Sequence, residues 1–127
     1  MRYWTFDVCT LIAEYEKNKK TLSAIYDAIK VAEGYQENPV GATSRGDWTQ
    51  YLKILYLRRD EYEMYVSMVA RGMSDLPEVE RLVLQWWLIG GYDDREIINH
   101  CGIENLEELK KIKKIALTKF TNIVMPN

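Results

Sequence analysis

Apolar residues recur at helical spacing from the start of the chain. Intervals of four and three alternate through the first stretch, which contains one polar member: Trp4, Val8, Leu11, Tyr15, Asn18, Leu22, Ile25, Ile29 and Ala32. This seven-residue repeat is the pattern of a coiled-coil seam, and also of any long helix that packs along one neighbour. We expect one long helix whose neighbour belongs to the same chain. A buried Asn18 at this seam would fix the register of the two helices.

A second apolar stripe predicts the neighbouring helix. It begins near Asp47, a good helix cap, and Arg58 and Arg59 interrupt it: Trp48, Tyr51, Leu52, Leu55, Tyr62, Tyr65, Val66 and Val69. Glycine and proline cluster between residues 34 and 46, which predicts a long connecting loop. Two helices of comparable length around one loop favour an antiparallel hairpin over residues 1–73.

Residues 74–127 predict shorter helices. Pro77 suits the first turn of a helix, and Gly90 with Gly91 suits its end. The buried face of this helix is predicted to consist of Val79, Leu82, Val83, Trp86 and Ile89.

Two capping patterns follow it. Asp93 with Glu96 forms a capping box, and Asn105 with Glu108 has the same spacing. Gly102 between them provides the positive φ of a tight turn, which Ile103 is expected to fill. The last helix then buries Leu109, Ile112, Ala116, Phe120 and Ile123. Helical periodicity without strand alternation predicts an all-α fold of five main helices, an N-terminal antiparallel helical hairpin followed by a three-helix domain.

Composition and charge narrow the class of protein. The chain has 127 residues, of which 47% are hydrophobic and 28% charged, as in an ordinary soluble domain. The net charge of -2, from 17 basic and 19 acidic residues, argues against attachment to nucleic acid by bulk charge but leaves room for a local basic stripe. The longest apolar stretch, Leu82 to Ile89, is too short to cross a membrane. We expect a cytoplasmic protein whose Cys9 and Cys101 are unpaired and at least partly buried.

Catalytic and metal sites find little support in the sequence. The lone histidine, His100, lies beside Cys101, but no second ligand pair accompanies them, which argues against zinc. Adjacent helical residues point about 100° apart, so this pair is not a catalytic dyad by virtue of adjacency. No phosphate-binding glycine loop is present. The sequence therefore predicts a non-enzyme without metal or cofactor.

A family resemblance points to a function. Residues Leu76 to Phe120 resemble region 4 of bacterial sigma factors, through Leu76-Pro77-Glu78, Glu80-Arg81, Val83-Leu84, Gly91, Glu96-Ile97, Gly102-Ile103, Ala116-Leu117 and Phe120. The whole chain is similar to the ArpU/RinA-type transcriptional regulators of phage and prophage late genes. This resemblance implies a helix-turn-helix domain that binds double-stranded DNA, with RNA polymerase as a second partner.

The candidate DNA-binding residues lie around the predicted turn. An outward arc of Lys110, Lys111 and Lys114 suits phosphate contact, although a lysine-rich solvated face has the same pattern. Asn105 suits adenine, whereas Glu107 and Glu108 suit cytosine or act only as helix-capping and dipole-complementing acids. Arg95, in the preceding helix, completes the set.

An alternative function stays open at this point. Acids at the start of the last helix, together with the negative net charge, favour a helical protein-binding adaptor or inhibitor of phage origin that keeps the fold without reading DNA. The seven-residue repeat also predicts self-association through the hairpin, because many DNA readers form homodimers that match two half-sites.

Overall fold

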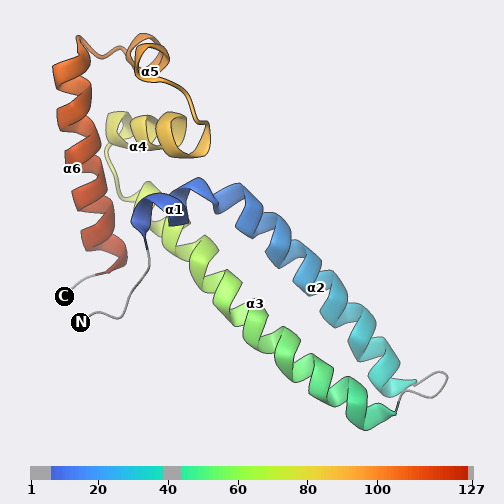
Figure 1. Ribbon diagram of the computed structural model, residues 1–127. Helices are drawn as coiled ribbons and strands as arrows, with labels where there is room; N and C mark the ends of the chain where they lie inside the picture. The colour runs from blue at the N-terminus through green and yellow to red at the C-terminus, as the bar shows by residue number, and fades with distance from the viewer. Residues whose placement is uncertain (1–6, 39–43, 126–127) are drawn as a thin grey trace. The chain divides into compact units, whose positions relative to one another are not determined.

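The computed structural model describes residues 7–38 and 44–125, and this part of the chain is entirely helical. Six α-helices and one π-helical turn follow one another: α1 (Val8–Ala13), α2 (Tyr15–Glu37), α3 (Arg45–Ser74), α4 (Glu78–Leu84), η1 (Gln85–Ile89), α5 (Asp94–Cys101) and α6 (Leu106–Val124). The predicted all-α class is confirmed, although the helices outnumber the five expected (Figure 1). No helix within these residues combines the length and apolar character needed to span a membrane.

The chain divides into two compact units. The hairpin unit contains Lys17–Val66, and the capped unit contains the described residues of Met1–Glu16 and Ser67–Asn127. The sequence predicted a boundary between residues 73 and 74. The structure instead divides within α3 and groups α1 with the C-terminal helices. Sequence periodicity could not locate this division, because both α2 and α3 continue through it as regular helix.

The two long helices of the hairpin unit run antiparallel and side by side (Figure 1). The Tyr26 hydroxyl donates to Glu63, and the Tyr56 hydroxyl donates to Glu33 at 2.7 Å. The later residue of α2 thus pairs with the earlier residue of α3, as expected for antiparallel helices. Between the helices lies an apolar cluster of Ile25, Ile29, Ala32, Leu52 and Leu55. The N-terminal stripe is thus partnered within the chain, as expected.

The ends of the hairpin helices differ from the prediction. The expected single N-terminal helix is interrupted at Glu14, whose φ of -93° and ψ of 9° separate α1 from α2. Ser44, rather than Asp47, caps α3: the Asp47 N–H donates to Ser44 Oγ at 3.1 Å, and the Ser44 N–H donates to the Asp47 carboxylate at 3.3 Å. Gly34 and Gly46 lie inside helices, so the connection is shorter than predicted.

Some predicted positions in this half lie outside the described residues. They are Trp4 of the N-terminal stripe, and Pro39 and Gly41 of the loop. Asn18, the polar member of the stripe, is 8% exposed, so its predicted burial is confirmed.

The capped unit is built around α4. This helix packs against α5 and α6, while α1 packs against η1 and α6. Val79, predicted to be buried, is 43% exposed, whereas the unpredicted Leu84 is fully buried beside Val83. A helix with neighbours on more than one side buries a broader face than a single stripe describes, and Val79 lies in the first turn, outside that face.

Candidate nucleic-acid interface

The segment from α5 to α6 is fixed by reciprocal caps at its start. The Glu96 N–H donates to the Asp93 carboxylate at 2.9 Å, and the Asp93 N–H donates back to Glu96 at 3.2 Å. Both members of the predicted capping box are therefore present. Acids in this first turn also complement the positive end of the helix dipole.

The turn between α5 and α6 has the geometry that the sequence predicts. Gly102 adopts φ 68° and ψ 36°, a left-handed conformation that side-chain-bearing residues rarely adopt. The Ile103 N–H then donates to the Ile98 carbonyl at 3.1 Å, and the Ile103 side chain is 8% exposed. It joins Val83, Ile97 and Leu109 in a cluster that holds α4, α5 and α6 together. The outer face of α6 is therefore presented on a fixed frame.

The lysines of α6 fall into two groups. Lys110, Lys111 and Lys114 are exposed, and none has a hydrogen bond or ion pair within the described residues. We call these three the lysine arc. Residues three and four apart share a helix face, so the arc presents three unneutralised charges together.

Lys113 and Lys119 are instead bound to other helices of the capped unit. Lys113 pairs with Asp94 at 2.7 Å and lies 4.4 Å from the centre of the Trp87 ring. Lys119 pairs with Glu80 at 3.1 Å. The spacing in the sequence gave no sign of these pairs, because their members lie on different helices. They remove two lysines from the candidate interface and tie α6 to α4, η1 and α5.

The acidic side of the candidate site lies at the start of α6. Glu107 and Glu108 are exposed in the first turn, where their charge complements the helix dipole. The Glu108 N–H donates to the Asn105 side-chain oxygen at 2.9 Å. Bidentate pairing of Asn105 with adenine would use this same oxygen. Helix capping therefore competes with base reading at Asn105.

The remaining candidate, Arg95, is exposed in the first turn of α5.

The aromatic side chains near this site pack against other side chains of the capped unit. Trp86 stacks on His100 with 4.3 Å between ring centres and lies 4.4 Å from the Tyr92 ring. Trp87 is covered by Lys113. Neither tryptophan is arranged as an open platform for bases.

Reactive groups are sparse around this site. Cys9 and Cys101 are both free and partly buried. Burial raises the pKa of the Cys101 thiol, and burial followed by the charge of Asp7 raises the pKa of Cys9. Both thiols are thus held in the less nucleophilic neutral form. No group of three or more metal-binding side chains occurs among the described residues.

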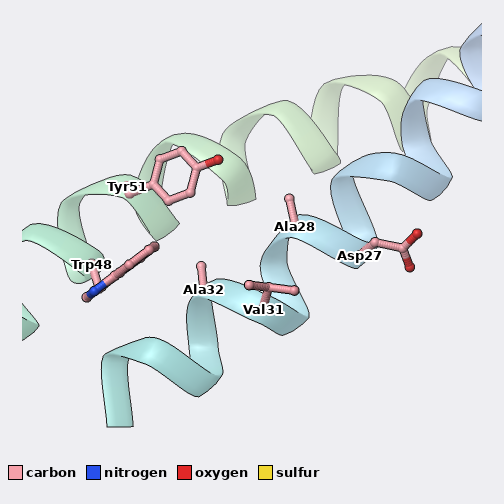
Figure 2. A pocket seen from close by; sticks show the side chains of 6 residues that line it. All are labelled: Asp27, Ala28, Val31, Ala32, Trp48 and Tyr51. Atoms are coloured by element: carbon pink, nitrogen blue, oxygen red, sulfur yellow. The ribbon is translucent and has the colours of Figure 1, made fainter. Parts of the chain in front are cut away.

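Within the described residues, each unit also has a surface hollow away from this site. The hairpin unit has an apolar groove of about 340 Å³ in which Ala28 and Ala32 face Trp48, while the Asp27 carboxylate points away (Figure 2). The capped unit has a hollow of about 390 Å³, where Arg81 is the charged residue of the lining. Neither lining contains a nucleophile beside a base.

No protein-family model, curated protein or solved structure matches the chain in sequence or fold comparisons.

Proposed function

We propose that the protein is a phage-type transcriptional regulator that binds double-stranded DNA through α5, the Gly102 turn and α6. In this proposal α6 is the second helix of a helix-turn-helix and enters the major groove. The resemblance to sigma-factor region 4 and to ArpU/RinA-type regulators supports this assignment. RNA polymerase in the cytoplasm is then the proposed protein partner.

The observation that carries the proposal is the exposed, unpaired lysine arc of Lys110, Lys111 and Lys114. Charge pairs bind Lys113 to Asp94 and Lys119 to Glu80, whereas the lysine arc has no such partner in the described part of the chain. Phosphate contacts by such residues position a protein on the duplex, and base contacts specify sequence. Arg95 at the start of α5 supplies a further cation for contact with the DNA phosphate backbone.

The glutamates limit this binding. Glu107 and Glu108 stabilise the start of α6 but repel phosphates that approach it. We expect weak binding that depends mainly on the lysine arc and has modest sequence preference. Positions of the protein on the duplex that bring phosphates close to this acidic turn would be disfavoured.

Fluorescence anisotropy with a labelled duplex at two salt concentrations tests the proposal. Lys111→Glu and Lys114→Glu are each expected to weaken binding to all duplexes and to lower the salt slope by about one counterion. Glu107→Ala is expected to strengthen non-specific binding, because it removes repulsion. Lys30→Glu in α2 is the control for net charge and is expected to leave duplex binding unchanged.

Unchanged affinity in both arc variants, or no binding even at low salt, would overturn the proposal. A protein-binding adaptor would then be the better assignment. One observation favours that alternative: Leu106 and Ile115 of α6 are 43% and 46% exposed, so apolar groups lie beside the charged ones on this helix. Such a mixture suits contact with another protein as well as with DNA.

A further inference from the structure

Helix α3 has a second apolar stripe that faces away from α2. Leu52 and Leu55 enter the hairpin core at 2% and 6% exposure. Ile54 and Leu57 each lie two residues further on, which is about 200° around the helix. They are 57% and 72% exposed, and Leu57 is the most exposed large hydrophobic residue of the described chain.

The spacing of this stripe is that of a helix–helix seam. Its positions follow at intervals of three, four and three: Ile54, Leu57 and Met64 are apolar, and Glu61 is the one charged member. Alternation of three and four is the pattern by which one helix packs along another. The inner stripe of α3 already uses α2 in this way, so the outer stripe matches a second helix that the hairpin unit does not supply.

We propose that the outer face of α3 binds a second copy of this chain, α3 against α3, in antiparallel orientation. The twofold axis would pass between residues 55 and 56. Ile54 then packs against Leu57 of the second copy, and the reverse contact follows by symmetry. This proposal does not rest on DNA binding.

The charges that flank the stripe decide the orientation. Lys53 and Asp60 occupy one flank, and Tyr51 and Arg58 occupy the other. A parallel pair would set Lys53 against Arg58 of the second copy, twice by symmetry, which places like charges together. The antiparallel pair sets Lys53 against Asp60 instead, so the flank becomes attractive.

The side chains of the flank formed by Lys53 and Asp60 are open to such contact. Lys53 is exposed and has no ion pair within the described residues. Asp60 pairs with its neighbour Arg59 at 3.1 Å but is still 63% exposed. On the opposite flank, Arg58 lies 5.9 Å from the centre of the Tyr62 ring of its own chain, and Tyr51 lines the hairpin groove beside Trp48. The attraction between the two copies therefore comes from Lys53 and Asp60.

Sedimentation of the full chain over a concentration series tests this pairing. The protein is expected to be a reversible dimer. Lys53→Glu alone and Asp60→Lys alone each place two like-charge contacts in the interface, and each is expected to weaken dimerisation about tenfold. The double variant Lys53→Glu with Asp60→Lys restores opposite charges and is expected to dimerise like the unchanged protein.

Mixing the two single variants gives the sharpest result. Glu at position 53 of one chain would meet Lys at position 60 of the other, while the native Lys53 and Asp60 form the second pair. An equimolar mixture is therefore expected to dimerise more strongly than either variant alone. Lys30→Glu on α2, an equal change of charge outside this face, is the control and is expected to have no effect.

Three outcomes would overturn the inference. They are a monomeric protein at all concentrations, single variants that dimerise unchanged, and a mixture no stronger than its components. Circular dichroism of each variant confirms that helix content is retained.

Discussion

The two units bury apolar surface in different ways. In the capped unit, short helices surround a centre in which Val83, Ile97, Leu109 and Phe120 are all 0% exposed. In the hairpin unit, two long helices share one seam and leave other faces open, so Ile54 and Leu57 lie in solvent. A helix with several neighbours can bury a broad face, whereas a helix with one neighbour buries only a stripe.

This difference is consistent with different proposed roles for the two units. A centre closed on itself can present a charged face without changing its own packing, as α6 does with its lysine arc. A unit with an open apolar stripe gains stability from a further partner. This contrast supports the proposals of DNA binding by the capped unit and of self-association by the hairpin unit.

The largest expected effect comes from truncating one side chain in each unit. Phe120→Ala removes a fully buried ring and is expected to lower the free energy of unfolding by about 3–5 kcal/mol. Leu57→Ala removes a side chain that is 72% exposed and is expected to cost about 0.5 kcal/mol or less in the monomer. Urea denaturation at low protein concentration measures both. Equal losses in the free energy of unfolding would contradict the difference in burial between the two units.

A smaller effect is expected from adding a methyl group to a helical glycine of each unit. A Cβ at Gly72 would lie 2.3 Å from the Phe120 ring, whereas one at Gly34 would meet nothing within 4 Å. Gly72→Ala is expected to destabilise the protein by about 1 kcal/mol or more through overpacking. Gly34→Ala is expected to stabilise it by about 0.5–1 kcal/mol through helix propensity. Thermal unfolding checks the signs, and a stabilising Gly72→Ala would contradict the close packing at Phe120.

Lys113 and Lys114 are adjacent in α6, but the first is expected to stabilise the fold and the second to contact DNA. Lys113→Ala breaks the contacts with Asp94 and Trp87, so about 1 kcal/mol of stability is expected to be lost. Lys114→Ala is expected to leave stability within about 0.5 kcal/mol but to weaken duplex binding. Denaturation and anisotropy on the same two samples measure both properties. Loss of stability in the Lys114 variant would show that the arc supports the fold.

The smallest expected effect concerns the thiols. The pKa values of Cys9 and Cys101 are raised in the folded chain, so both are expected to react more slowly with a thiol reagent at mildly alkaline pH than in denaturant. A raised pKa means that each thiol ionises less easily in the folded chain than in the unfolded chain, so ionisation favours the unfolded state. The folded state therefore loses stability as pH rises above the thiol pKa of the unfolded chain. Equal reaction rates with and without denaturant would contradict the partial burial.

Local features were the most predictable from sequence. The capping box at Asp93 and the left-handed Gly102 depend on residues within one turn of each other, and the structure has both. The cap of α3 was misplaced because Ser44 and Asp47 cap one another across the same four residues, and the sequence alone favoured the acid. The buried repeat of α2 was predictable because it extends over several turns.

Features that depend on distant residues were not predictable. The spacing of α6 marked its lysines as a group, yet Asp94 and Glu80 neutralise only Lys113 and Lys119. The position of α1 in the capped unit likewise requires contacts with η1 and α6, far along the chain. Periodicity identifies which face of a helix is apolar, but it does not identify the helix that covers this face.

The most direct test is backbone-amide NMR of the full chain titrated with a short duplex at low salt. The proposed function predicts shift changes centred on Lys110, Lys111 and Lys114 that diminish as salt is added, because the contacts are with phosphates. Residues of α3 between 45 and 66 are expected to remain unchanged. Shift changes confined to that part of α3, or none at low salt, would contradict the assignment of DNA binding to α6.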